Sequence, residues 1–199
     1  MFFNRDLLLK VLYRVLAIVL VAVWAVFIVF TGYFSLMKRV YPLKFKDEII
    51  KYSNYYGIEE FLIFSFVKVE SDFDEKAVSN KGAIGLMQIT PKTGEYIARL
   101  NGARNYDLTN PETNINFGCY YLGYLLDKFN NIDTTICAYN AGEGNVSEWL
   151  KNPEYSDDGE RLKSVPFGET REYIKKIKKT FEKYKKLYGN ILDKRQKFE

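Results

Sequence analysis

The longest apolar stretch of the chain lies near its N-terminus. Residues 15–37 are 23 uncharged positions between Arg14 and Lys38. As a helix rising 1.5 Å per residue they would reach about 34 Å, enough to cross a bilayer core of about 30 Å. A cleaved signal peptide would have a shorter apolar region and a small-residue cleavage site, and no convincing site follows. The pattern favours an uncleaved transmembrane anchor, and basic residues on both flanks leave its orientation open.

Beyond the anchor, apolar residues recur at spacings of three and four, which predicts helices. Thr90–Pro91 and Asn110–Pro111 each place an N-cap residue before a proline, a combination that starts helices. Gly57 ends a short helix, and residues 71–89 lose the periodicity, which predicts a loop with a short hairpin. The expected helices cover residues 47–56, 58–70, 91 onward, 111–129, 134–141, 145–150 and 169–188.

The composition is that of an ordinary globular protein, with 47% hydrophobic and 27% charged residues among 199. The chain contains no histidine, which excludes serine triads, Cys-His nucleophile pairs and most zinc hydrolase sites. Its two cysteines are too few for a cysteine-only metal site or a disulfide framework. Any catalysis must therefore rely on carboxylates, hydroxyls or amides.

The net charge of +4 conceals two parts of opposite sign. Residues 40–160 contain 11 basic and 19 acidic residues, a balance of −8, whereas residues 161–199 contain 13 and 5, a balance of +8. An acidic middle would repel nucleic acid, and no nucleic-acid motif accompanies the basic end. The lysines of the last expected helix form either a solvated face or a face held against anionic wall polymers or lipid headgroups. These lysines are Lys175, Lys176, Lys178, Lys179, Lys183, Lys185 and Lys186.

One carboxylate stands where an apolar residue is expected. Ile63, Phe66, Val67 and Glu70 share one face of the expected helix, so the stripe that should be buried ends in Glu70. Apolar surroundings and the negative end of the helix dipole would both raise the pKa of this carboxyl group. A carboxylic acid that stays protonated near neutral pH can act as a general acid. The alternative is that the helix frays before Glu70 and its side chain points into water.

Four short motifs follow one another along the chain. They are Glu70–Ser71, Gly82–Gln88, Ala138–Gly142 and Glu169–Tyr173. In order and approximate spacing they resemble the soluble lytic transglycosylase family, and the resemblance extends over residues 46–181. It implies a mainly α, lysozyme-like helical domain with a short loop or hairpin segment at the cleft, here preceded by one N-terminal transmembrane helix.

The resemblance implies a role for each matching residue. Glu70 matches the catalytic acid and base of the family, and the tyrosine, asparagine and loop positions match residues that line the sugar cleft. For several of these residues a purely structural role stays open. Ser71 would be a turn residue, Met87 and Tyr173 would pack in the core, and Tyr139 and Asn140 would make structural hydrogen bonds. The expected substrate-binding residues are Ser71, Gly85, Met87, Gln88, Tyr139, Asn140 and Tyr173.

The implied activity is cleavage of the β-1,4 bond between N-acetylmuramic acid and N-acetylglucosamine in peptidoglycan, by one glutamate that forms 1,6-anhydro ends. No metal or cofactor is expected. The partners are a glycan strand and, through the anchor, a bacterial cell membrane crossed once, with the catalytic domain on its outer side. The alternatives are a hydrolytic muramidase similar to goose-type lysozyme and a non-catalytic wall-binding module.

The expected organisation follows from the anchor and the resemblance together. It comprises a cytoplasmic N-terminus at 1–14, the anchor at 15–37, a linker at 38–45, the catalytic domain at 46–188 and a basic tail at 189–199.

The sequence also departs from the family pattern. Many family members carry a methionine before the proline of the cleft segment, whereas this chain has Ile89–Thr90–Pro91. Glu143 occupies a position at which the family often has proline. Cys119 and Cys137 lie on neighbouring expected helices, and core packing is the first interpretation of both, with a disulfide as the alternative.

Overall fold

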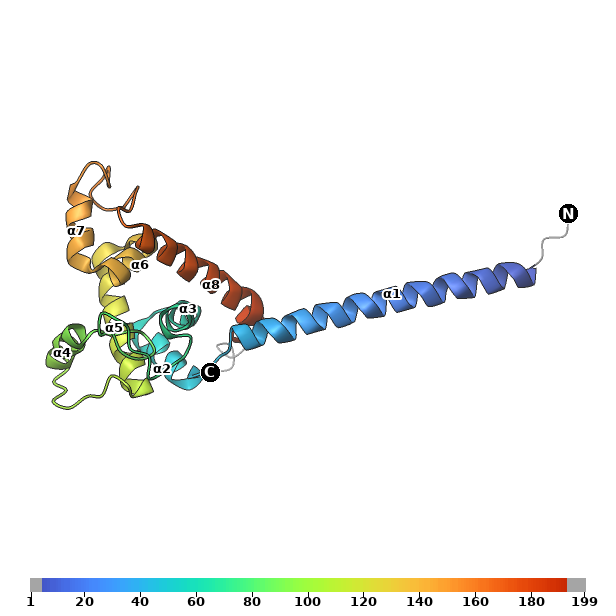
Figure 1. Ribbon diagram of the computed structural model, residues 1–199, viewed down its shortest axis with the longest axis horizontal. Helices are drawn as coiled ribbons and strands as arrows, with labels where there is room; N and C mark the ends of the chain where they lie inside the picture. The colour runs from blue at the N-terminus through green and yellow to red at the C-terminus, as the bar shows by residue number, and fades with distance from the viewer. Residues whose placement is uncertain (1–4, 193–199) are drawn as a thin grey trace. The chain divides into compact units, whose positions relative to one another are not determined.

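The computed structural model describes residues 5–192 of the chain. Residues 1–4 of the expected cytoplasmic N-terminus and residues 193–199 of the expected basic tail therefore lie outside the described residues. The chain divides after Pro42 into two compact units (Figure 1).

The first unit is a single helix, α1, which spans Arg5–Val40. Among the described residues it is the one helix long and apolar enough to cross a membrane, with its candidate span at Leu9–Val40. Most of its described apolar side chains are exposed, as Trp24 at 65% illustrates. Lipid can cover such a surface, whereas water would oppose its exposure. The expectation of one N-terminal apolar helix is confirmed.

The second unit is built from helices, as the apolar spacing predicts. The described residues contain no strand beyond isolated bridges of Ile84 with Val78 and with Ile89, which form the short hairpin of the cleft segment. The mainly α prediction is therefore confirmed. The helices are α2 (Lys46–Tyr56), α3 (Glu60–Ser71), α4 (Pro91–Leu100), α5 (Pro111–Phe129), α6 (Ile132–Ala141), α7 (Glu143–Lys151) and α8 (Gly168–Leu192).

The local start and stop signals act as expected. The side chains of Thr90 and Asn110 accept hydrogen bonds from the backbone N–H three residues on, and a proline follows each. Gly57 ends α2 in the left-handed conformation. One signal escapes the sequence reading: Asn131 caps α6, so this helix begins two residues before the expected Thr134.

Helix α3 lies in the interior of this unit. It packs against α8 and α2, and every residue from Phe61 to Val67 is buried. The ring of Phe64 stacks on that of Tyr184 of α8, with centroids 5.4 Å apart. Burying each large apolar side chain of this kind contributes roughly 1.5–3 kcal/mol. The end of α3 is therefore held rigidly within the core.

Both cysteines belong to the core, as the first interpretation has it. Cys119 of α5 and Cys137 of α6 are buried free thiols. Burial raises the pKa of both, that of Cys137 to about 12, so neither is a thiolate near neutral pH.

Candidate active site

Glu70 occupies the last turn of α3. The helix continues to Ser71 and ends at Asp72, which takes the left-handed conformation, so the helix does not fray before Glu70. The apolar stripe that precedes Glu70 is fully buried, and its own side chain is half-buried. The carboxylate thus lies at the border between core and solvent, where a reacting group must be.

The environment of Glu70 favours its protonated form. Burial raises the pKa of its carboxyl group to about 7, although a hydrogen bond from the Tyr173 hydroxyl opposes this shift by stabilising the charged form. Tyr173 belongs to the first turns of α8 and is itself buried, with its ring against Phe66 of α3. Glu70 can therefore hold or release a proton near neutral pH.

Tyr139 lies beside the same carboxylate. Its ring packs on Phe66 with centroids 4.7 Å apart, and its hydroxyl donates a hydrogen bond of 2.9 Å to Met87 O. Burial and the nearby negative charge of Glu70 raise the pKa of Tyr139 well above its usual value. The tyrosine consequently stays a neutral donor. Its hydrogen bond to Met87 joins α6 to the cleft loop, residues 84–88.

Ser71 joins Glu70 to that loop. Its Oγ lies 2.9 Å from Leu86 O and 3.1 Å from Val67 O, so the hydroxyl can donate to one carbonyl of the loop and to one of its own helix. Ser71 is thus a positioning residue in this structure. It fixes residues 84–88 against the end of α3.

Gln88 adopts a positive φ of 50°, which is uncommon for a residue with a side chain. Its amide nitrogen donates to Gly85 O at 2.9 Å and to Ala77 O at 3.2 Å. The amide oxygen accepts no hydrogen bond from the described residues. That oxygen is the atom of Gln88 that is available to a ligand.

Met87 lies where the core-packing alternative places it. Its side chain is completely buried against Gly118 of α5, and a Cβ at Gly118 would come within 2.3 Å of its sulfur. The side chain therefore anchors the loop and offers no surface to a ligand. The backbone of Met87 is also engaged, since its N–H donates to Asn114 and its carbonyl accepts from Tyr139.

Asn114 is one of two residues of the site to which the sequence analysis gives no role. It is fully buried in the first turn of α5 and makes three hydrogen bonds to backbone groups. Its Oδ1 accepts from Met87 N at 2.7 Å, and its Nδ2 donates to Ile84 O at 2.8 Å and Leu108 O at 2.7 Å. A polar residue at a buried helical position was the available signal. Asn114 holds the cleft loop in place from behind.

Gly85 lies directly against Asn114. Its φ of +77° is in the left-handed region, and a Cβ built on it would come within 2.3 Å of Asn114 Nδ2 and 2.5 Å of Leu108 O. Glycine is needed here for close approach of the backbone to protein. The residue is buried, so it shapes the loop from the inner side.

Asn140 is exposed and follows Tyr139 on α6. Its Oδ1 accepts a hydrogen bond of 2.8 Å from Thr170, a buried residue of α8 that the sequence reading also missed. Because Thr170 occupies the amide oxygen, the orientation of the Asn140 side chain is fixed. The amide nitrogen of Asn140 remains as a donor at the surface.

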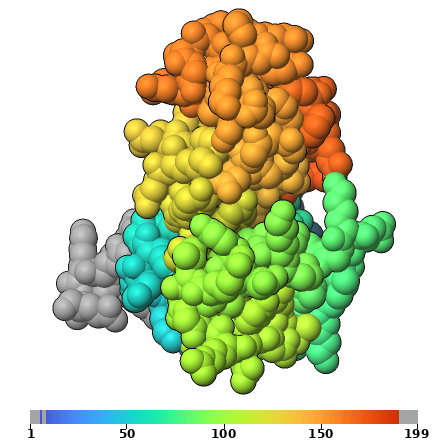
Figure 2. Space-filling view, turned by 90° about the vertical axis from the view of Figure 1, so that its left-hand side faces the viewer, coloured from blue at the N-terminus to red at the C-terminus, as the bar shows by residue number. Residues whose placement is uncertain are grey.

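These contacts bring the predicted residues into one site. Glu70 and Ser71 come from α3, Tyr139 from α6 and Tyr173 from α8, while residues 84–88 supply the loop between them. In the space-filling view, the yellow and orange segments after residue 130 lie above and green α4 with its loop lies below (Figure 2).

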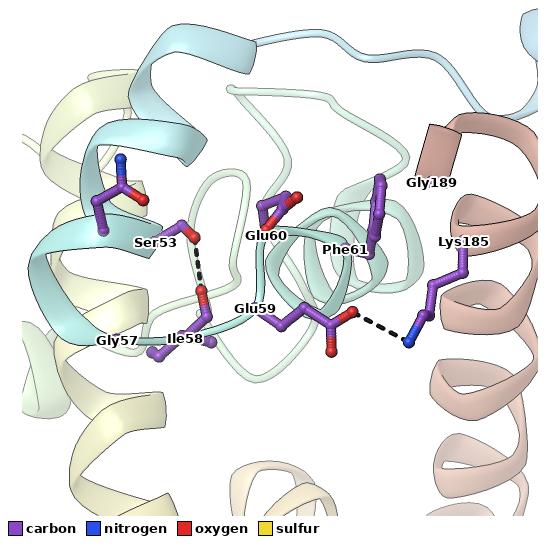
Figure 3. Close-up of a pocket in the computed structure, with 9 residues that line it drawn as sticks. Ser53, Gly57, Ile58, Glu59, Glu60, Phe61, Lys185 and Gly189 are labelled. Atoms are coloured by element: carbon purple, nitrogen blue, oxygen red, sulfur yellow. Dashed lines mark hydrogen bonds and ion pairs between the residues drawn. The ribbon is translucent and has the colours of Figure 1, made fainter. Parts of the chain in front are cut away.

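An open pocket lies elsewhere on the unit. It has a volume of about 560 Å³ and lies between the α2–α3 turn and the C-terminal part of α8 (Figure 3). Ser53 donates to Ile58 O at 2.6 Å within it, and Lys185 reaches Glu59 at 3.3 Å. None of the expected site residues lines this cavity. This pocket is therefore separate from the candidate active site.

Known proteins provide an independent comparison. Residues 47–161 match the family described as the transglycosylase SLT domain. The soluble lytic murein transglycosylase of Escherichia coli K12 is 35% identical over 147 residues, which are 71% of this chain and 23% of that protein. The membrane-bound lytic murein transglycosylase C of Actinobacillus pleuropneumoniae is 34% identical over 160 residues, 67% of this chain and 44% of the relative.

Solved structures agree with the sequence comparison. The 70-kDa soluble lytic transglycosylase of Escherichia coli superposes with a TM-score of 0.68 at 32% identity, covering 77% of this chain and 26% of that chain. An inactive Glu-to-Gln mutant of the Pseudomonas aeruginosa transglycosylase Slt superposes with a TM-score of 0.65 at 30% identity, covering 74% and 25%. The chain thus spans about a quarter of the length of the first soluble relatives that it matches. The expected lysozyme-like transglycosylase fold is confirmed.

Proposed function

The chain belongs to the transglycosylase SLT domain family, and from this premise we propose that it is a lytic transglycosylase of peptidoglycan. It cleaves the β-1,4 bond between N-acetylmuramic acid and N-acetylglucosamine and leaves a 1,6-anhydromuramyl end. One observation carries this proposal: the half-buried carboxyl group of Glu70 accepts a hydrogen bond from Tyr173, and burial raises its pKa to about 7, which suits both the acid and the base form.

The number of carboxylates bears on the reaction type. Most glycosidases use two, one as acid and one as nucleophile or base. Among the site residues described above, Glu70 is the one carboxylate. A reaction in which one carboxyl group serves twice therefore fits the site better than one that needs a pair.

In the proposed reaction Glu70 first acts as the acid. Its proton passes to the glycosidic oxygen while the bond from that oxygen to C1 of the muramyl residue breaks. The N-acetyl group of the substrate helps to stabilise the cation that develops. The carboxylate then takes the proton of the muramyl 6-hydroxyl, whose oxygen bonds to C1. Glu70 ends protonated, and no water is consumed.

The neighbouring residues orient the two partners. Tyr173 donates to Glu70 and stabilises the carboxylate that forms after the first proton transfer. We assign the amide oxygen of Gln88 and the amide nitrogen of Asn140 to hydrogen bonds with the sugars. An internal hydroxyl attacks with a high effective molarity when the cleft holds the ring in place.

The same proposal fixes the location of the domain. Peptidoglycan lies outside the cytoplasmic membrane, so we place the domain from Leu43 onward on the outer side and α1 across the membrane once. A membrane-bound transglycosylase among the relatives and the apolar helix α1 support this arrangement.

The products test the function directly. Purified full-length protein should release muropeptides with 1,6-anhydromuramyl ends from sacculi, and mass spectrometry distinguishes these from reducing ends by the mass of one water. Reducing ends would identify a hydrolytic muramidase instead. Binding to sacculi without any cleavage would identify a wall-binding module.

The pH dependence gives a second prediction. Because Glu70 must be protonated to begin the reaction, kcat/KM should fall about tenfold per pH unit above about pH 7. Tyr173→Phe removes the hydrogen bond that lowers the pKa of Glu70, so the alkaline limb should move to higher pH. Assays of glycan cleavage between pH 5 and 9 measure both effects.

A matched control for Tyr173→Phe is Tyr56→Phe. Tyr56 also loses a side-chain hydrogen bond, to Asn116, but it makes no contact with Glu70. Its profile should coincide with that of the wild type. An unchanged profile for Tyr173→Phe would contradict the assignment of the alkaline limb to Glu70.

A further inference from the structure

Helix α8 carries seven lysines, and they fall into two groups. Three of them form ion pairs: Lys175 with Glu172 of the same helix at 2.8 Å, Lys178 with Asp133 of α6 at 2.9 Å, and Lys185 with Glu59, which precedes α3, at 3.3 Å. The other four form no ion pair with any described residue. These four are Lys176, Lys179, Lys183 and Lys186, and we call them the lysine stripe.

The members of the lysine stripe share one face of the helix. Their spacings of three, four and three residues place them in a single row. Three of the four are exposed, and Lys183 is half-exposed. The stripe is therefore a row of charges on the surface rather than a scatter of lysines around the helix.

The buried side of α8 fixes the direction of this row. Tyr173, Ile177 and Tyr184 are buried, and α8 packs along α3 (Figure 1). The helix cannot rotate without exposing these side chains. The four charges therefore have a constant direction relative to Glu70 of α3, because Glu70 accepts a hydrogen bond from Tyr173 of α8.

The surrounding charge makes the stripe distinctive. Residues 40–160 carry a balance of −8, so an anionic surface would repel most of the unit and attract α8. Such a distribution selects one orientation on an anionic surface.

The covalent tether brings an anionic surface close. Only residues 41–45 separate the end of α1 from the start of α2. At about 3.5 Å per residue these five span at most about 18 Å. If α1 crosses the membrane, this short connection keeps the second unit near the lipid headgroups at all times.

We propose that the lysine stripe docks the second unit on the anionic lipid headgroups of the membrane that α1 spans. Each lysine near such a surface favours the docked state roughly fivefold. Docking through this stripe fixes the direction in which the Glu70 site faces. The inference rests on α1 as an anchor and does not depend on which bond the site cleaves.

The test uses the full chain in lipid nanodiscs. Glu182→Cys places one exposed thiol on α8 for a fluorescent label, and both native cysteines are buried. Quenching by lipids with a nitroxide headgroup reports how close α8 lies to the surface. Quenching should be several-fold stronger with about one third phosphatidylglycerol than with phosphatidylcholine alone, and salt should abolish the difference.

Charge-matched variants isolate the stripe. Replacing Lys176, Lys179, Lys183 and Lys186 by Gln should abolish the lipid-dependent quenching. The control replaces Lys92, Arg99, Arg104 and Lys151 by Gln, which removes the same charge from exposed positions elsewhere and should leave the quenching unchanged.

Three outcomes would overturn the proposal. The first is equal quenching in the two lipid compositions, and the second is an equal loss in the stripe and control variants. The third is loss of the protein from the discs in high salt, which would show that α1 does not anchor it. If quenching is independent of lipid but the stripe variant alone loses binding to isolated walls, the stripe binds an anionic wall polymer instead.

Discussion

Replacing Glu70 by Gln is expected to reduce the release of anhydromuropeptides by at least about 10²-fold and as much as 10⁴-fold. The amide has nearly the same shape as the carboxyl group and can accept the hydrogen bond from Tyr173. It cannot deliver a proton to the glycosidic oxygen or remove one from the 6-hydroxyl. Mass spectrometry of digested sacculi measures the loss, and a merely halved rate would contradict the assigned role.

Measurements of the free energy of unfolding distinguish a loss of catalysis in Glu70→Gln from a loss of folded protein. The folded-state pKa of Glu70, about 7, lies above the ordinary value of 4.5. As pH rises from about 4.5 to 7, the unfolded chain releases this proton before the folded one does, so wild type loses stability. Glu70→Gln has no such proton and should be more stable above pH 7 by up to about 3 kcal/mol, with no difference below pH 4. Urea unfolding at pH 4 and pH 8 measures this difference.

Local signals explain why most of the fold could be predicted from the sequence. Asn110–Pro111 starts α5 and Gly57 ends α2. In both cases the residues that contact one another are close neighbours in the sequence, so the local pattern predicts the helix end. The expected start of α6 at Thr134 is two residues late, because the side chain of Asn131 accepts a hydrogen bond from the Thr134 N–H and so starts the helix at Ile132.

The site was predictable to the extent that a polar residue interrupts an apolar stripe. Glu70 was found this way, because it continues the face of Ile63 and Phe66. Asn114 carries the same signal, since it precedes buried Gly118 and Leu122 by four and eight residues on α5. Applying the rule throughout the chain would have found it.

Other features of the site arise only from tertiary structure. The hydrogen bond between Tyr173 and Glu70 joins residues 103 positions apart, and that between Tyr139 and Met87 spans 52. No local pattern specifies such pairs. The sequence also could not decide between a ligand contact and core packing for Met87, because this depends on the space left by Gly118.

The loop that carries Gly85 leads to the second large effect that we expect. Gly85→Ala should lower the free energy of unfolding by roughly 2–5 kcal/mol, through backbone strain and overpacking against Asn114 and Leu108. Movement of the loop to relieve this overlap would displace Gln88 and Met87. A shift of about 1 Å in a site can cost about 10²-fold in rate.

Gly82→Ala is the matched control for this prediction. Gly82 has nearly the same φ, +76° against +77° at Gly85, so alanine suffers the same backbone strain of about 1–2 kcal/mol at both positions. A Cβ at Gly82 meets no atom within 4 Å, whereas one at Gly85 meets the Asn114 amide and a backbone carbonyl. Urea unfolding and cleavage rates of the two variants should therefore differ widely. If Gly82→Ala and Gly85→Ala lose stability and activity equally, the close contact with Asn114 does not hold the cleft loop in place.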